Sequence, residues 1–200
     1  MSINAVDLFP RVNELVLISS RDKSSFPNLA YFKSSIPSLV PLSLLPKISI
    51  ELDGVSAAEL EAILQMIYNV RALDLGILSG ILLHRILRNH GNLGTRVNQH
   101  IQSLDIDDVA LTLGSAQRLC TLLSNQLFNL KQVSFCIYDS YRQWNWRPSS
   151  IIDVKNESTK RIINLIYFLV DHLQQLVSLH IKFSRRTPSE TMICLIRIRT

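Results

Sequence analysis

The sequence predicts an α/β fold: one array of repeating units, with parallel strands on one side and helices on the other. The first observation is a recurring template, apolar-x-x-apolar-x-x-Leu-x-apolar, in which the apolar spacing changes from three residues to two. A step of three suits the turn at a helix end, and a step of two suits a strand with one buried face. The second observation is that segments with helical spacing separate the copies, and such strand–helix–strand units build parallel sheets.

Six copies of the template divide the chain. Ile67–Leu75 and Leu127–Phe135 are complete copies, whereas Leu45–Leu52 reads as a copy shortened by one residue. We therefore expect one array over residues 1–200, with strands near 14–18, 49–53, 72–76, 103–107, 132–137 and 178–183. Residues 21–44 form an irregular stretch, because their prolines exclude a regular helix and recur too closely for a full repeat.

Helix-start signals precede the segments between these strands. A Ser-x-x-Glu capping box at residues 56–59 comes before an apolar face that begins at Leu60. A second capping box at residues 187–190, with Pro188 at the first helical position, predicts a helix that runs to the end of the chain. Three further amphipathic segments follow single candidate cap residues, which are Ser79, Ser115 and Ser158.

Composition restricts the class of protein. Of the 200 residues, 47% are hydrophobic, which is ample for a core, and only 18% are charged, so some apolar surface is expected to be covered. Three cysteines without a Cys-x-x-Cys pair argue against a disulfide framework and a zinc site, and favour a reducing compartment.

The longest apolar run, Ile162–Val170, is too short for a membrane span, and no signal peptide is recognisable. We expect a cytoplasmic protein, with the nucleus as the alternative.

The template, with amphipathic helices of variable length between its copies, resembles the irregular leucine-rich repeats of F-box/LRR proteins. The Phe9-Pro10 and Leu45-Pro46 openings are also similar to that group, which belongs to the ribonuclease-inhibitor-like superfamily. The resemblance implies a leucine-rich repeat solenoid, a horseshoe with parallel strands on its concave face and helices on its convex face. It extends over nearly the whole chain.

The same resemblance implies a protein-interaction module, the substrate-recognition repeats of an SCF-type ubiquitin ligase. In that family an F-box docks the Skp1 adaptor, and the repeats hold a substrate for ubiquitin-dependent catabolism. Here the first repeat begins by Val6 and leaves no room for an F-box, so Skp1 is an expected partner only if an F-box precedes this chain. We therefore expect a fragment of a larger product. The alternatives are a repeat scaffold or inhibitor with no ubiquitin link and, more remotely, an RNA-binding surface.

Five carboxylates are expected on the concave face, because they occupy polar positions of three neighbouring strands. Adjacent strands lie about 4.8 Å apart, so Glu51, Asp74 and Asp105 are expected to form a ladder of like charges. Such a ladder is unfavourable unless water, salt or a basic partner relieves it. The pattern predicts a docking stripe for a Lys/Arg-rich segment; the alternative is a solvated face without a partner. The stripe residues are Glu51, Asp53, Asp74, Asp105 and Asp107.

A second candidate interface follows the fifth strand. Both tryptophans of the chain lie there together with tyrosines and arginines, and these residue types dominate interface hot spots. The alternative is that the rings cover the edge of the sheet. The predicted aromatic-basic rim consists of Tyr138, Tyr141, Arg142, Trp144, Trp146 and Arg147, with Arg185 and Arg186 at the equivalent place in the next repeat.

Catalytic patterns are missing from the sequence. It contains no phosphate-binding glycine loop, nucleophile elbow or His-Glu-x-x-His pair, so we expect no enzyme, no cofactor and no metal. His180 and Cys136 are expected on the concave face of adjacent strands. A Cys136/His180 pair is conceivable, but repeat scaffolds seldom carry out chemistry. Cys120 and Cys194 lie on apolar helical faces and are expected in the core.

Overall fold

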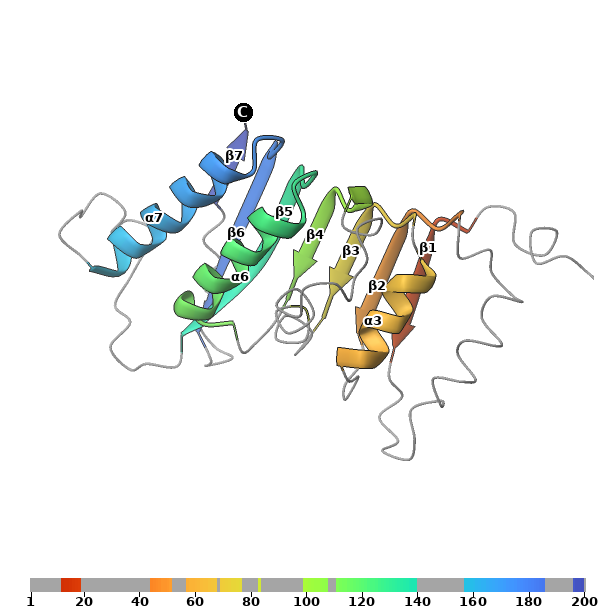
Figure 1. Cartoon of the computed structure of the whole chain (residues 1–200). Coiled ribbons are helices and arrows are strands. Elements are labelled where there is room, and N and C mark those ends of the chain that lie inside the picture. Colours follow the sequence, from red (N-terminus) through yellow and green to blue (C-terminus); the bar gives the residue numbers. More distant parts are fainter. Residues whose placement is uncertain are drawn as a thin grey trace, which may run out of the picture.

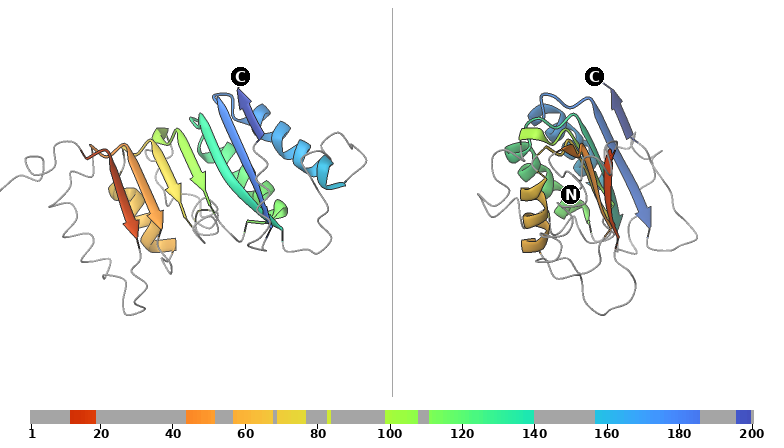
Figure 2. Two further views of the ribbon diagram at one scale, coloured as in Figure 1. Left: turned by 180° about the vertical axis from the view of Figure 1, so that it is seen from behind. Right: turned by 90° about the vertical axis from the view of Figure 1, so that its right-hand side faces the viewer.

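A computed structural model of the chain describes residues 12–18, 44–51, 57–67, 69–76, 83, 99–107, 111–139, 157–185 and 196–199. These residues form a seven-stranded sheet whose strands lie side by side in sequence order. Three helices lie together on one face of this sheet, as Figures 1 and 2 show. In chain order the elements are β1 (Glu14–Ile18), β2 (Lys47–Glu51), α3 (Ala57–Met66), β3 (Ala72–Leu75), β4 (Ser103–Ile106), α6 (Leu113–Gln126), β5 (Gln132–Asp139), α7 (Glu157–His172), β6 (Ser178–Arg185) and β7 (Ile196–Arg199).

The predicted α/β class with a parallel sheet is confirmed. Strands β1 to β6 pair in parallel, each with the next along the chain. Parallel neighbours need a crossover connection, and the described crossover helices all lie on the same face, so the opposite face carries no described helix (Figure 2, right). We call this opposite face the open face.

The chain end differs from the prediction. Residues 196–199 form strand β7, which pairs antiparallel with β6, and not the end of a helix that starts at residues 187–190. Isoleucine and arginine alternate with a period of two at this place, Ile196-Arg197-Ile198-Arg199, which is a strand pattern. The capping box can stabilise only the start of a helix, whereas the free edge of β6 offers a row of backbone hydrogen bonds. Pairing with this edge therefore determines the structure of residues 196–199.

The template has a concrete structural meaning in the turns that lead into the strands. Its first two apolar positions are joined by a backbone hydrogen bond from the second residue to the first, over 3.2 Å for Ile67 and Val70. The same bond joins Leu127 to Leu130 over 3.2 Å and Leu173 to Leu176 over 2.9 Å. One carbonyl in each repeat then accepts two successive N–H groups of the next repeat; these carbonyls are those of Pro46, Arg71, Gln102 and Lys131.

The core lies between the sheet and the three helices. Alternate residues of each strand point into it, so that the paired strands contribute matching layers. One such layer, in which every side chain is at most 1% exposed, consists of Ile48, Leu73, Leu104, Val133 and Leu179. Cys120 is also buried here, and this burial raises the pKa of its thiol.

Two predicted helices have different outcomes. Helix α6 begins at Leu113 and not after Ser115. Thr112 is its N-cap, and the Thr112 N–H donates a hydrogen bond over 2.8 Å to the hydroxyl oxygen of Ser115 at the third helical position. Apart from the buried Leu83, the helix expected after Ser79 lies outside the described residues, as do Cys194 and most of the irregular stretch 21–44.

Strand β2 begins at Lys47, two residues ahead of the expected range 49–53. Its copy of the template is not shortened: Ile48 pairs with Leu73 and Ile50 with Leu75, so Leu45 takes the place that Val70 has in the next repeat. Because the sequence analysis placed the start of β2 at residue 49 and not at Lys47, it aligned the wrong residues of β2 with those of β3. This shift decides which side chains meet on the open face.

Candidate interaction face of the sheet

The open face is built from the polar alternation of the strands. Because side chains alternate between the two faces of a strand, the residues between the core positions form rows across the open face. The register aligns one row along Val16, Ser49, Asp74, Asp105, Ser134 and His180. A neighbouring row runs along Glu14, Lys47, Ala72, Ser103, Gln132 and Ser178.

The predicted ladder of Glu51, Asp74 and Asp105 is wrong in one member. Asp74 pairs with Asp105 as expected, but Ser49 and not Glu51 lies opposite Asp74 on β2. Glu51 falls two residues further along β2, where it pairs with Ile18 of β1 but lies beyond Ile50, the last residue of β2 that pairs with β3. The reason is the phase of β2, because a strand start that is shifted by two residues moves each side chain to the next row.

Gly76 separates the two remaining carboxylates of this region. Its N–H bonds to the Ile50 carbonyl, and a Cβ at this glycine would lie 3.3 Å from the Glu51 Cα. The N–H of Asp107 bonds to the Leu75 carbonyl in the same way, so Glu51, Gly76 and Asp107 continue the strands in a third row. The glycine thus keeps Glu51 and Asp107 a strand apart, at about twice the 4.8 Å strand spacing. Asp53 lies outside the described residues.

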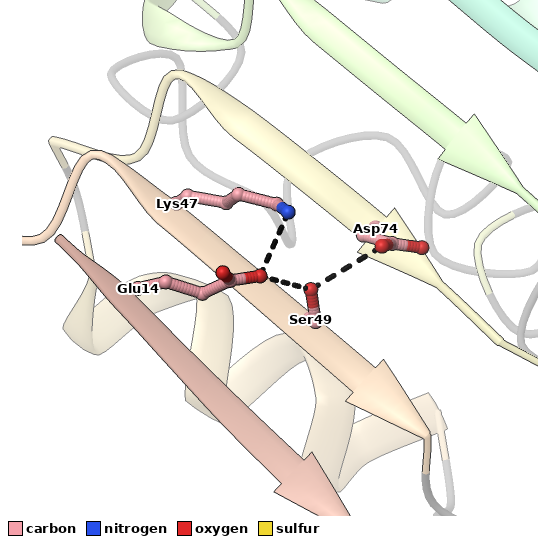
Figure 3. A network of polar contacts seen from close by, with 4 residues as sticks. All are labelled: Glu14, Lys47, Ser49 and Asp74. Carbon is pink, nitrogen blue, oxygen red and sulfur yellow. Dashed lines mark hydrogen bonds and ion pairs between the residues drawn. The ribbon is translucent and has the colours of Figure 1, made fainter.

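A polar network links β1, β2 and β3 across the open face (Figure 3). The Lys47 ammonium lies 2.7 Å from the Glu14 Oε1 atom. The Ser49 hydroxyl is 2.8 Å from the same oxygen and 3.3 Å from the Asp74 Oδ2 atom. A hydroxyl has one proton, so Ser49 cannot donate fully to both carboxylates, and the shorter distance favours Glu14.

The two carboxylates of this network have opposite pKa shifts. Hydrogen bonds from Lys47 and Ser49 lower the pKa of Glu14. Burial raises the pKa of Asp74, and the neighbouring Asp105 carboxylate raises it further, more than the Ser49 bond lowers it. Lys47 therefore compensates Glu14 first. Its charge also lowers the pKa of Asp74, but less than burial and Asp105 raise it, and no ion pair to Asp74 is found among the described residues.

Sequence reasoning missed Glu14, Lys47 and Ser49 as members of this face. The signal that could have found them is the alignment of Leu45-x-x-Ile48-x-Ile50 with Val70-x-x-Leu73-x-Leu75. That alignment puts Lys47 beside Ala72 and Ser49 beside Asp74, as the register shows. The position of Glu14 on the open face follows from the alternation of side chains within the strand 14–18 itself.

The two ends of the open face differ in charge. We call its β1–β4 part the acidic half; its charged described residues are Glu14, Lys47, Glu51, Asp74, Asp105 and Asp107. The C-terminal half, on β5–β7, has His180 and Lys182 on β6, while Arg197 and Arg199 take the register positions opposite His180 and Ser178. Within the described residues of this half, the His180 Nε2 atom lies 3.2 Å from the Ser178 hydroxyl.

The aromatic-basic rim lies almost wholly outside the described residues. This applies to Tyr141, Arg142, Trp144, Trp146, Arg147 and Arg186. Tyr138 and Arg185 belong to strands β5 and β6, where their register partners are Ser184 and Asp139. Cys136 pairs with Lys182, and Ser134, not Cys136, pairs with His180.

No metal-binding group of three or more His, Cys, Asp or Glu side chains occurs in the part of the chain that the structure describes. Among the same residues, no helix is both long enough and apolar enough to cross a membrane. No protein-family model, curated protein or solved structure significantly matches the chain.

Proposed function

We propose that the chain is a leucine-rich repeat solenoid that acts as a protein-interaction module, and that its open face receives a Lys/Arg-rich segment of a partner protein. The observation that carries this proposal is the charge of the acidic half. Five carboxylates and one ammonium group occupy its described positions, although the whole chain has a net charge of +5. A cationic segment is the partner chemistry that such a surface complements.

The solenoid part of the proposal is supported by the repetition of the backbone contacts. Three helix-to-strand turns, at residues 67–70, 127–130 and 173–176, each contain the same type of backbone hydrogen bond. Successive strands are also connected in the same way, by one carbonyl that accepts two successive N–H groups. A chain that repeats one unit in this way buries each unit against its neighbours. Among the described residues, no helix covers the strand surface opposite α3, α6 and α7, although Ser49 and Cys136 on that surface are buried.

Lys47 provides an intramolecular example of the recognition that we propose. Its ammonium lies 2.7 Å from the Glu14 carboxylate, which the Ser49 hydroxyl also contacts. Asp74 and Asp105 are paired in register without an equivalent lysine between them. A lysine or arginine of a partner would supply the missing counter-charge, and burial around Asp74 would strengthen the contact relative to a fully exposed pair.

Charge reversal at the paired aspartates tests this site. We expect the double variant Asp74→Lys/Asp105→Lys to bind a fluorescent lysine-rich peptide at least about tenfold more weakly than the wild type at about 50 mM salt. Fluorescence anisotropy measures the binding, and circular dichroism checks that both proteins are folded.

The matched control is Glu61→Lys/Asp171→Lys. It makes the same change of net charge, but its residues lie on helices α3 and α7, away from the open face. Unchanged binding by the open-face variant, or an equal loss in both variants, would overturn the docking proposal.

The ubiquitin-ligase role belongs to the same proposal and rests on the resemblance to F-box/LRR proteins. In this role the open face holds the substrate, and a separate F-box links it to Skp1 and the SCF complex. A pull-down with Skp1 and the full-length gene product tests it. Absence of Skp1 binding would leave a repeat scaffold or inhibitor with no ubiquitin link.

A further inference from the structure

The two edge strands of the sheet have different sequences. At one edge, β7 alternates isoleucine with arginine, and charged residues of this kind protect an edge from pairing with another chain. At the other edge, β1 has the sequence Glu-Leu-Val-Leu-Ile, without proline or a basic residue. Its Val16 and Ile18 side chains are 44% and 67% exposed. The β1 edge therefore lacks the sequence features that protect β7.

The core side of β1 is also less covered than that of its neighbour. Leu15 and Leu17 are only partly buried, whereas their partners Ile48 and Ile50 on β2 are at most 1% exposed. All four apolar residues of β1 thus retain accessible surface. A further strand beside β1 would cover side chains on both faces of the sheet at once.

The backbone of β1 offers hydrogen bonds to such a strand. In the following strands, the residues that lie on the open face donate back to the preceding strand: Ala72 to Pro46, Ser103 to Arg71 and Gln132 to Gln102. In a parallel ladder alternate residues bond to opposite neighbours. The equivalent residues of β1 are Glu14, Val16 and Ile18, and no described strand precedes them.

We propose that β1 pairs antiparallel with β1 of a second copy of this chain, with the two-fold axis at Val16. This register places Val16 opposite Val16 on the open face and Leu15 opposite Leu17 on the core face. The result is a continuous sheet through two copies, an isologous interface in which each copy presents the same residues. Both open faces then lie on the same side, so the dimer does not depend on the docking function proposed above.

Charge and side-chain type select this register. The antiparallel arrangement places each Glu14 opposite Ile18, and the two Glu14 side chains are far apart. Parallel in-register pairing would place Glu14 directly opposite Glu14, which is unfavourable. A shift by one residue would bring the open-face residues of one copy beside the core-facing residues of the other, so it would break both apolar pairings.

Cysteine cross-linking tests the register directly. The Cα atoms of hydrogen-bonded antiparallel partners lie about 5.5 Å apart, within the range that a disulfide spans. Val16→Cys should therefore form a disulfide-linked dimer under mild oxidation. Ile18→Cys is the matched control: the two Ile18 residues are four positions out of register, about 13 Å apart, which is beyond disulfide reach. Wild-type protein, oxidised alongside, accounts for the native cysteines.

Analytical ultracentrifugation tests the oligomeric state. We expect the wild type to sediment as a dimer of the 22.8 kDa chain and Val16→Lys to sediment as a monomer, because two lysines would meet on the axis. Val170→Lys, an exposed position on α7, should remain dimeric.

Two results would overturn the proposal. One is a monomeric wild type together with no cross-link at position 16, which would leave the edge for a strand of another protein. The other is equal cross-linking at positions 16 and 18. Lysine-peptide binding by Val16→Lys is measured in parallel, so that failure of dimerisation and failure of the docking site are distinguished.

Discussion

The acidic half and the C-terminal half of the open face rest on the same scaffold but carry different chemistry. The core layer beneath them is uniform, and its five aliphatic residues from Ile48 to Leu179 are at most 1% exposed. The row above that layer changes from Asp74 and Asp105 on β3 and β4 to Ser134 and His180 on β5 and β6. The comparison indicates that the core positions of each strand specify the sheet, whereas the open-face residues differ from strand to strand. In the proposed function, recognition would therefore depend on the rows and not on the fold.

The halves also differ in the length of their strands. Strands β3 and β4 have four residues each, whereas β5 and β6 have eight. The longer pair adds the buried side chains of Ile137 and Phe183 to the core. The C-terminal half thus has more packing beneath it, and the acidic half relies more on the layers that both halves share.

The largest expected effect comes from breaking a shared layer. Phe135 on β5 is 1% exposed and pairs with Ile106 of the acidic half and Ile181 of β6. Phe135→Ala should lower the free energy of unfolding by about 3–5 kcal/mol, because it removes buried apolar area and leaves a cavity. Urea unfolding followed by circular dichroism measures the change.

The neighbouring open-face residue provides the control for this variant. Ser134→Ala should change the free energy of unfolding by less than about 0.5 kcal/mol, because it leaves the core intact. A loss of under about 1 kcal/mol in Phe135→Ala would contradict a core that is shared by the two halves.

The parallel α/β class could be predicted because the apolar template directly reflects burial. Val133, Phe135 and Ile137 alternate along the sequence and are all buried in β5. The rows of the open face were harder to predict, because polar residues between core positions carry no periodic signal of their own. Their assignment depended on the phase of each strand, and Pro46 and Lys47 before Ile48 obscured the start of β2.

Strand β7 could not be predicted for a different reason. Its four residues follow a capping-box signal, and the edge of β6 with which it pairs is a feature of the assembled sheet. The network of Glu14, Lys47 and Ser49 is also non-local, since 35 positions separate Glu14 from Ser49 in the chain. Such contacts follow from strand register and not from local sequence.

Converting the C-terminal half into an acidic surface should sharpen the comparison. His180→Glu/Lys182→Glu would continue the carboxylate positions across β6. We expect about fivefold tighter binding of the lysine-rich peptide at low salt, because two surface charges contribute roughly 0.5 kcal/mol each. High salt should remove the gain, since it screens exposed charges.

The matched control for this variant is Lys160→Glu/His172→Glu on helix α7. It replaces the same residue types, and both side chains are about half exposed. Equal gains in the two double variants would show that the peptide responds to net charge and not to the open face. No gain in the open-face variant would restrict peptide binding to the acidic half.

The smallest expected effect separates the two carboxylates within the acidic half by pH. Because the pKa of Asp74 is raised in the folded chain, its ionised form costs stability at neutral pH, and protonation restores that stability as the pH falls through this pKa. Asp74→Asn should therefore be more stable than the wild type at pH 7, by less than about 1 kcal/mol because solvent screens the pair, and should lose this advantage in acid.

Glu14→Gln should be less stable than the wild type at pH 7. The lowered pKa of Glu14 reflects a stabilising bond to Lys47, and this bond is lost only as the pH falls through that pKa. Urea unfolding of the three proteins between neutral and acidic pH measures these differences. An Asp74→Asn difference that stays constant with pH would mean that the Asp74–Asp105 pair is already neutralised, so that no counter-charge is missing from the acidic half.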